Sequence, residues 1–286
     1  TYNEAGELTS VTDFTGKTTR WTHDATGRVA TIDYPNDADV SFAYTATGAR
    51  STATDGHGTT THAHDARDRL VRRTDSAGRV IEYSYDAAGN LTSRVTASQT
   101  LVYRYDARNR LVAVESSVAG GPTRITRYAY DAHGTRTQII ASDGTTTDYR
   151  YDRRSRLHEL VQRSAAAVVL FSATYTTDAA GLRTGIEEAD ATGPTRTVAY
   201  TYDATRRLTQ ETIAHRDASR DRTTAWTYDR VGNRVTQVTT TGSGITQSTT
   251  TVTSEHDAND RLTREEEREG AGAPRITTTT YDANGN

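Results

Sequence analysis

The sequence contains no cysteine and no methionine, only four prolines, and a single lysine, Lys17, among its 34 cationic residues. Without cysteine the chain can form neither a disulfide nor a thiolate metal site. No apolar stretch approaches the roughly 18 residues that a membrane-spanning helix needs, and no segment has the features of a signal peptide. These absences exclude a disulfide-stapled fold, a thiolate metal site and a helical membrane span within this segment.

The lack of methionine also bears on the ends of the chain, because no initiator residue is present. Residues 2–6 and residues 281–286 are two copies of one recurring motif, and the second copy is cut short. We therefore expect this sequence to be a fragment of a longer protein.

The composition favours strands with polar faces. Of 286 residues, 34% are hydrophobic, 55 are threonine, 16 are tyrosine and only three are phenylalanine. Threonine and tyrosine favour strands, and the side chain of arginine, which supplies nearly all the positive charge, is long and amphipathic. The net charge of −3 gives no support for a nucleic-acid partner. Length alone suggests about two domains, but an internal repeat overrides that estimate.

The repeat is marked by an anchor residue, usually aspartate, that follows an aromatic or similar residue. Anchors are 20 or 21 residues apart up to residue 106 and 21 to 28 residues apart thereafter. They are Asn3, Asp24, Thr45, Asp65, Asp86, Asp106, Asp131, Asp152, Asp178, Asp203, Asp229, Asp257 and Asp282. We therefore predict that residues 1–286 form a single array of about 12 repeats.

Each anchor begins a turn. Three residues after it stands a glycine in eight of thirteen cases, namely Gly6, Gly27, Gly48, Gly89, Gly134, Gly181, Gly232 and Gly285. Aspartate at the first position of a type I turn bonds nearby backbone groups, and glycine at the fourth accepts a positive φ. Where glycine is absent, Asp68, Asn109 and Asp260 tolerate that conformation, whereas Ser155 and Arg206 are less suited to it. The motif predicts a hairpin turn with positive φ at its glycines.

Apolar and aromatic residues flank the turn at fixed positions. Five residues after the anchor stands an aliphatic residue in eight of the twelve complete repeats, and an aromatic-x-aromatic pair such as Tyr83/Tyr85 precedes many anchors. Spacing by two places both rings on one face of a strand. The residues that we expect to anchor the repeats structurally are Asp24, Asp65, Tyr85, Asp86, Gly89, Leu91, Tyr105, Asp106, Tyr130, Asp131, Gly134, Tyr151, Asp152, Tyr202, Asp203, Tyr228, Asp229 and Gly232.

A second turn lies between successive anchors, as at residues 13–16, 55–58, 75–78 and 142–144. One repeat is thus two strands and two turns, and the extra residues of the second half fall at this second turn. The acidic run 265–269 precedes a Gly/Pro-rich turn and is expected to be a strand end rather than a helix. The fold class that follows is all-β: an array of antiparallel β-hairpins in a continuous sheet, curved or spiral because open sheets beyond about ten strands curl, split or close.

The unit at residues 83–91, Tyr-Ser-Tyr-Asp-Ala-Ala-Gly-Asn-Leu, closely resembles the YD repeat of bacterial Rhs proteins, Tc-toxin shells and teneurins. The resemblance covers essentially the whole chain in about a dozen copies. It implies a spiral β-sheet that forms part of a hollow shell around a variable, toxic C-terminal domain, or a similar shell that serves cell adhesion. Such shells end in a self-cleavage motif of the type Asp-Pro-x-Gly-Leu. The nearest string here, residues 178–182, lacks the proline and is expected to be an ordinary turn.

Three histidines could suggest a metal site. His57, His62 and His64 lie close together, and the last two share one strand face. Yet His62 and His64 fill the two positions that Tyr83 and Tyr85 occupy in the next repeat. We therefore expect them to pack as aromatic substitutes and expect no bound metal.

No catalytic constellation emerges either. The aspartates recur at turns instead of facing one another across a cleft, as glycoside hydrolysis requires. No Gly-x-Ser-x-Gly elbow, Walker loop or Gly-x-Gly-x-x-Gly motif is present. Arginine at the aliphatic position is expected to stack on tyrosine rings rather than form a cationic stripe; this holds for Arg50, Arg136, Arg183 and Arg234. We expect no enzymatic activity and no cofactor.

Two functions remain open. In the first, the segment is a non-enzymatic part of a bacterial shell, secreted or at the cell surface, whose partners are the remainder of the shell and a C-terminal toxin or effector polypeptide. In the second, exposed aromatic, threonine and arginine side chains form an adhesion or carbohydrate-binding surface, because rings stack on sugars and guanidinium groups bind acidic groups. Surface glycans are then the partner. The family resemblance favours containment, and composition does not separate the two functions.

Overall fold

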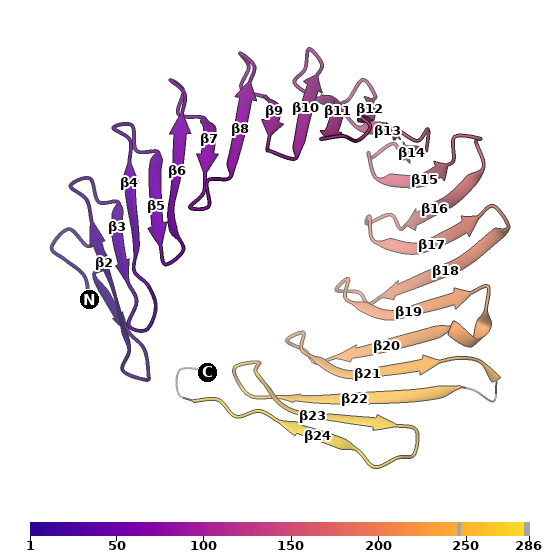
Figure 1. The fold of residues 1–286 in the computed structure, drawn as a ribbon. Helices are drawn as coiled ribbons and strands as arrows, with labels where there is room; N and C mark the ends of the chain where they lie inside the picture. Colours follow the sequence, from indigo (N-terminus) through magenta and orange to yellow (C-terminus); the bar gives the residue numbers. More distant parts are fainter. Residues whose placement is uncertain (245–246, 283–286) are drawn as a thin grey trace. The chain divides into compact units, whose positions relative to one another are not determined.

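The computed structural model describes residues 1–244 and 247–282. The chain divides into two compact units, Thr1–Tyr128 and Ala129–Asn286. Each unit is a layer of antiparallel strands in which successive strands lie side by side (Figure 1). Strands β1 to β12 lie in the first unit, except for the last two residues of β12, and β13 to β24 lie in the second.

The strands of the first unit are β1 (Ser10–Thr12), β2 (Thr18–His23), β3 (Val29–Asp33), β4 (Val40–Tyr44), β5 (Arg50–Asp55), β6 (Gly58–His64), β7 (Leu70–Thr74), β8 (Val80–Tyr85), β9 (Leu91–Val95), β10 (Gln99–Tyr105), β11 (Leu111–Val118) and β12 (Arg124–Tyr130). Within this unit each strand pairs antiparallel with the next along the chain.

The strands of the second unit are β13 (Arg136–Ile140), β14 (Thr146–Tyr151), β15 (Leu157–Arg163), β16 (Val169–Thr177), β17 (Arg183–Asp190), β18 (Gly193–Tyr202), β19 (Leu208–His215), β20 (Arg222–Tyr228), β21 (Arg234–Thr241), β22 (Ser248–His256), β23 (Leu262–Glu269) and β24 (Arg275–Thr278). These strands also pair antiparallel in chain order. A 3₁₀ turn, Ala218–Arg220, joins β19 to β20, and Asp217 caps its start.

The predicted all-β class of antiparallel hairpins is confirmed. The described residues contain no α-helix, and none of their helical segments has the length and apolar character needed to cross a membrane. The acidic run 265–269 is the end of β23, as expected. That residues 1–286 act as a single array stays a prediction, although the same repeat continues through both units.

The extra residues of the later repeats lengthen strands. In the first unit β3, β5 and β7 have five or six residues, whereas β18 has ten. Asp190 and Gly193 form the last pair of the β17–β18 ladder, so that hairpin closes on a tight turn despite its length. The strands therefore differ in how far they extend toward the edge of the sheet that carries the second turns.

A β-bulge recurs at one position of the repeat, and the sequence reading did not anticipate it. In the β8–β9 pair, Ser84 lies opposite Ser93, but the next residue, Tyr85, lies opposite Leu91, so that Thr92 is the extra residue. The same shift occurs at the end of β2, β4, β6, β10, β14, β16, β18, β20 and β22. A bulge bends its strand and increases the local twist, so each repeat carries a built-in bend next to its anchor.

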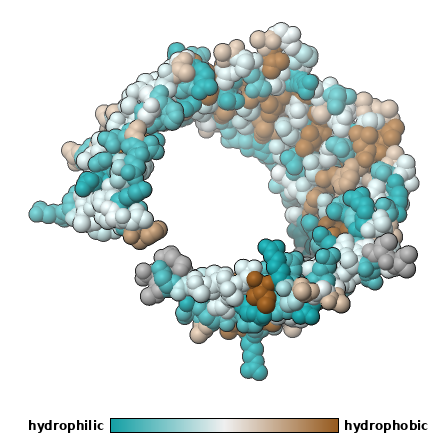
Figure 2. Space-filling model, turned by 60° about the horizontal axis from the view of Figure 1, so that its bottom comes forward, coloured by the Kyte–Doolittle hydropathy of each residue, from teal (hydrophilic) through white to brown (hydrophobic). Residues whose placement is uncertain are grey.

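Few side chains are fully buried, as expected of a layer that lacks a second layer to cover it. The buried residues are Ala113, Val161, Ala173, Val198, Ile213 and Thr224. The space-filling view is mostly teal and white, with brown side chains gathered toward its upper right (Figure 2). Along β8 the aromatic residues are half-buried and the intervening Ser84 is exposed. The prediction that each aromatic pair faces one side of the sheet is confirmed, but its rings are only partly covered.

Candidate functional site

The anchor turn has the predicted geometry. The backbone N–H of Asp24 donates to the carbonyl of Arg28 at 2.8 Å, and the N–H of Gly27 donates to the carbonyl of Asp24 at 3.0 Å. These two bonds define a type I turn followed by a left-handed residue, one of the common hairpin connections. The φ angles at the tested glycines are positive, which confirms the prediction; they are 80° at Gly27, 98° at Gly48, 98° at Gly89, 92° at Gly134, 92° at Gly181 and 110° at Gly232.

The turns without glycine adopt the same conformation. Their φ angles are 58° at Asp68, 58° at Asn109, 58° at Ser155, 66° at Arg206 and 61° at Asp260. Ser155 and Arg206, which the sequence reading judged unsuited, are therefore held in the left-handed region by the hairpin around them. Gly285 lies outside the described residues.

The carboxylates of the anchors cap the turns that they begin. The Oδ1 atom of Asp24 accepts hydrogen bonds from the backbone N–H groups of Thr26 at 2.8 Å and Arg28 at 3.1 Å. Asp131 accepts from the N–H groups of His133 and Thr135, both at 2.9 Å. These bonds occupy donors that the turn leaves without backbone partners.

The same capping occurs in the other repeats. The remaining anchor carboxylates that accept a backbone N–H are Asp65, Asp86, Asp106, Asp152, Asp178, Asp203, Asp229 and Asp257.

The residue four positions after the anchor is a component that the sequence reading missed. It is arginine in six repeats, and each of these arginines forms an ion pair of 2.7 Å with its anchor aspartate: Arg28, Arg69, Arg110, Arg156, Arg207 and Arg261. In two further repeats Asn90 and Asn233 donate to Asp86 and Asp229 at 2.9 and 3.0 Å. The signal was available, because half of the complete repeats carry arginine at this one position.

These contacts change the acidity of the anchors. The hydrogen bond from the Arg69 side chain is the main reason that the pKa of Asp65 falls to about 2. The Arg261 side chain acts in the same way and lowers the pKa of Asp257 to about 2. A carboxylate that accepts several hydrogen bonds in its charged form resists protonation. Asp65 and Asp257 are therefore anionic at neutral pH, which suits capping and does not suit acid–base catalysis.

The same arginines reach into the next repeat. The guanidinium of Arg69 lies 4.7 Å from the centre of the Tyr85 ring and donates from Nη1 to the carbonyl of Asp86 at 3.0 Å. The other arginines at this position that stack on the next repeat's tyrosine are Arg28, Arg207 and Arg261, at 4.5 to 4.7 Å. One side chain thus bonds its own turn, covers a neighbouring ring and contacts the neighbouring turn.

Where a tyrosine precedes the anchor, its hydroxyl completes the connection in the opposite direction. The Tyr85 hydroxyl donates to the carbonyl of Leu70 at 2.9 Å, and the Tyr105 hydroxyl donates to the carbonyl of Leu91 at 2.9 Å. Equivalent bonds to the preceding repeat are made by Tyr44, Tyr151, Tyr202, Tyr228 and Tyr281, over 2.7 to 3.0 Å. Tyr130 is half-buried at the end of β12. The repeats that carry these tyrosines are therefore tied to the preceding repeat by side-chain to backbone bonds as well as by the sheet.

Arginine at the aliphatic position stacks on a tyrosine ring in two repeats, as predicted, and on phenylalanine or tryptophan in the other two. The guanidinium carbon lies 4.4 Å from the ring centre of Phe42 for Arg50, 4.8 Å from Tyr149 for Arg136, 4.5 Å from Tyr175 for Arg183 and 5.8 Å from Trp226 for Arg234. The partner ring belongs to the same repeat for Arg50, Arg183 and Arg234, and to the next repeat for Arg136. The aromatic face is consequently covered in part by guanidinium groups.

The sequence-predicted anchor residues do not converge on one pocket. Within each unit the described anchor residues lie at successive turns, and contacts such as that between Arg69 and Tyr85 bring together sets from adjacent repeats. Residues 178–182 form an ordinary anchor turn, with the N–H of Gly181 donating to the carbonyl of Asp178 at 3.1 Å.

The histidines occupy aromatic positions. His62 and His64 are half-buried on one face of β6, and the Nδ1 atom of each is buried without a hydrogen-bond partner. Burial, with a smaller contribution from the charge of Arg73, lowers the pKa of His62. Among residues 1–244 and 247–282, no group of three or more His, Asp or Glu side chains is arranged to hold a metal ion.

Comparison with known proteins gives a family match for two segments and a fold for nearly the whole chain. The RHS Repeat family model matches residues 2–39 and 64–101. A crystal structure of TcdB2-TccC3-TEV superimposes on 98% of this chain with a TM-score of 0.68 and 13% identity. The Photorhabdus luminescens Tc holotoxin pore with a mutated TccC3 covers 97% with a TM-score of 0.52 and 14% identity. TcdB2-TccC3 without its hypervariable C-terminal region covers 97% with a TM-score of 0.50 and 14% identity.

These likenesses concern part of much larger chains. This chain spans 18% to 19% of the lengths of those solved structures. No curated protein matches its sequence. Residues 2–39 and 64–101 therefore match RHS repeats, the other described repeats share the same turn geometry, and the chain has a fold similar to that of these solved structures.

Proposed function

We propose that this chain is a structural segment of a shell that encloses or presents a C-terminal polypeptide, and that residues 1–286 belong to one continuous array. The observation that carries the proposal is the connection between neighbouring repeats within each unit: stacked arginines and tyrosine hydroxyls, such as those of Arg69 and Tyr85, join adjacent repeats, where an enzyme would gather side chains into one site. Repeats that contact only their neighbours build extended surfaces.

The comparisons support the same role. The fold is similar to that of TcdB2-TccC3, one crystal structure of which is described as lacking a hypervariable C-terminal region. We infer from this that a variable polypeptide is the partner of the present chain, which would act outside the producing cell or at its surface. The shell itself would perform no chemistry.

Limited proteolysis of the protein with its native flanking sequence tests this proposal. A closed shell excludes a protease by size, so the C-terminal polypeptide should be digested much more slowly inside the full-length protein than when expressed alone. The matched control is a full-length protein with a protease site inserted between the shell and that polypeptide, in an external linker. Equal digestion rates for the enclosed and free polypeptides would contradict enclosure.

The alternative, an adhesive or glycan-binding aromatic surface, has less support from the side chains. Rings that bind sugars need an open face, whereas Tyr85, Tyr149 and Tyr228 each carry a guanidinium within 5 Å of the ring centre. Binding of the purified protein to a glycan array, lost on replacement of Tyr85, would favour this alternative over enclosure.

A further inference from the structure

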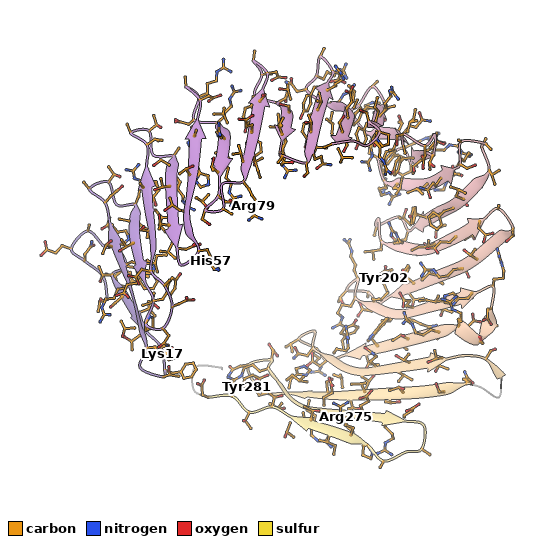
Figure 3. The ribbon with its side chains drawn as sticks, in the orientation of Figure 1. Lys17, His57, Arg79, Tyr202, Arg275 and Tyr281 are labelled. Carbon is orange, nitrogen blue, oxygen red and sulfur yellow. The ribbon has the colours of Figure 1, made fainter. Side chains whose placement is uncertain are left out.

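A groove in the first unit is not explained by the repeat architecture. It has a volume of about 880 Å³ and lies between two successive second turns, residues 75–79 and 96–98. Strands β7, β8 and β9 and the first residue of β10, Gln99, supply its remaining lining. Arg79, at the end of the first of these turns, projects from the same edge of the sheet as His57 in the β5–β6 turn (Figure 3). We call this feature the β7–β9 groove.

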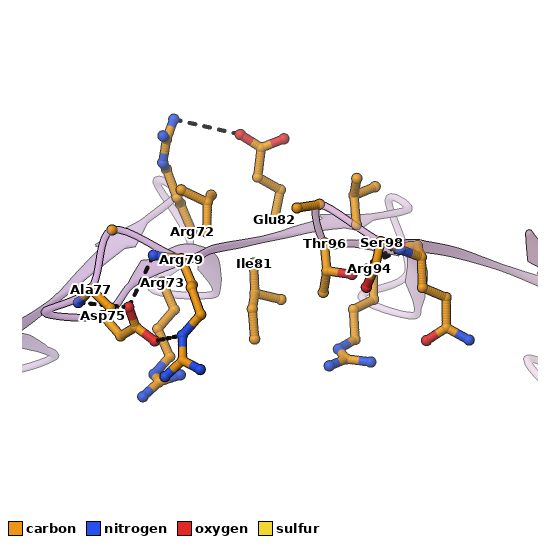
Figure 4. Close-up of a pocket in the computed structure, with 15 residues that line it drawn as sticks. Arg72, Arg73, Asp75, Ala77, Arg79, Ile81, Glu82, Arg94, Thr96 and Ser98 are labelled. Atoms are coloured by element: carbon orange, nitrogen blue, oxygen red, sulfur yellow. Dashed lines mark hydrogen bonds and ion pairs between the residues drawn. The ribbon is translucent and has the colours of Figure 1, made fainter. Parts of the chain in front are cut away.

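The charged side chains of the groove are sorted by face. Arg73, Arg79 and Arg94 point to one side of the sheet, with Ile81 between the first two and the third (Figure 4). Arg72 and Glu82 point to the other side, where their ion pair measures 3.5 Å. The lining therefore separates three guanidinium groups from the nearest glutamate.

The groove face keeps an excess of positive charge. Asp75 is its acidic lining residue, and it is bound to Arg79 at 2.6 Å. Arg73 and Arg94 are both half-buried, and neither guanidinium group forms a hydrogen bond or ion pair with any residue in the described part of the chain. His62, which lies opposite Arg73 in the β6–β7 ladder, adds little charge at neutral pH because burial lowers its pKa. Two guanidinium groups are thus left without anionic partners.

We propose that the β7–β9 groove binds an acidic segment of polypeptide, with carboxylates at Arg73 and Arg94 and an apolar side chain over Ile81. Guanidinium groups present a planar fork that matches a carboxylate. Arg73 and Arg94 lie on strands separated by one strand, which places their backbones about 10 Å apart. Acidic residues four positions apart in an extended peptide span about 13 Å, and the lengths of the side chains absorb the difference.

The apolar element favours a peptide over a free phosphate. Ile81 stands between the arginines on the same face. A phosphate or polyphosphate would leave this side chain unused, whereas an acidic peptide with a central leucine would cover it. The proposal does not depend on the shell function and identifies a binding surface that the repeat alone does not supply.

Fluorescence anisotropy with the whole chain tests the site. The probe is a labelled peptide, Gly-Glu-Ala-Leu-Ala-Glu-Gly, compared with the same peptide carrying glutamine for both glutamates. The double variant Arg73→Gln/Arg94→Gln should bind the acidic peptide at least about tenfold more weakly than the wild type, because both charge-assisted contacts are lost. Arg72→Gln is the matched control, since it removes the adjacent arginine from the opposite face and should change the affinity less than about twofold.

Two further measurements keep the result unambiguous. The variant Arg73→Lys/Arg94→Lys retains the charge without the planar fork, so it should bind the acidic peptide with intermediate affinity. It serves as the test if circular dichroism shows that the double glutamine variant does not fold. Competition with tripolyphosphate distinguishes the two anion classes. The proposal is wrong if the acidic and glutamine peptides bind equally, if Arg72→Gln weakens binding as much as the double variant, or if tripolyphosphate binds and the acidic peptide does not.

Discussion

The hydrogen bond from the Tyr85 hydroxyl to the preceding repeat offers a direct measure of coupling between repeats. Tyr85→Phe removes the 2.9 Å bond to the Leu70 carbonyl and leaves the ring under Arg69. A typical net hydrogen bond contributes about 0.5 to 1.5 kcal/mol. We expect the local opening free energy of the β7–β8 region to fall by that amount, which corresponds to amide exchange about two- to twelvefold faster.

The assay is native-state hydrogen exchange, because an array of this kind need not unfold in one step. Tyr83→Phe is the control: it lies two residues away on the same face, and its hydroxyl has no hydrogen bond to any described residue. Amides of β7 and β8 should exchange faster in Tyr85→Phe and stay unchanged in Tyr83→Phe, while amides of distant repeats change in neither. Equal acceleration in both variants, or none in Tyr85→Phe, would refute the coupling role of the hydroxyl.

Three more outcomes are expected. Ser155→Gly should stabilise the protein by about 0.5 to 1 kcal/mol in thermal unfolding, because φ is 58° at Ser155 and glycine accepts that angle. Gly89→Ala should destabilise it by a similar amount, because φ is 98° at Gly89 and the added Cβ would meet no neighbouring atom. Opposite signs would contradict the turn assignment. Arg69→Gln should raise the pKa of Asp65 from about 2 toward 3.8 in an NMR titration, and an unshifted pKa would refute the ion pair as the cause of the low value. In the wild type the stabilisation from Asp65 is present above about pH 4 and is lost as pH falls through about 2. Ala173→Leu should cost about 1 to 3 kcal/mol in urea unfolding because Ala173 is only 1% exposed, and a neutral effect would show that its surroundings can relax.

The sequence predicted those parts of the structure that depend on one residue type at a fixed spacing. Glycine three residues after an anchor implies a positive φ, and the structure has it at Gly27 and Gly89. Arginine on an aromatic ring was likewise expected from its place in the repeat, and Arg50 lies over Phe42. In these cases local chemistry alone leaves few alternatives.

The features that were missed depend on the neighbouring strand or repeat. Ser155 and Arg206 seemed unsuited to a left-handed conformation, but two strands held in register by the hairpin impose it. The role of Arg69 requires knowing which ring of the next repeat lies beside it. The bulge at Thr92 has no composition signal, because it is a property of register between two strands. The repeat pattern of the sequence also gives no signal for the boundary between the two compact units.

The antiparallel pairing of consecutive strands constrains how such an array can change in length. Each repeat contributes two strands. Duplication or loss of a whole repeat therefore leaves every later strand with its original direction, every later anchor turn at its original edge of the sheet, and every later aromatic pair on its original face. Loss of one strand would reverse the direction of everything that follows and move every later anchor turn to the opposite edge. Arginine and tyrosine contacts between repeats, such as those of Arg69 and Tyr85, would then have no partners. Length variation among proteins of this kind should therefore occur in even numbers of strands, as whole hairpins.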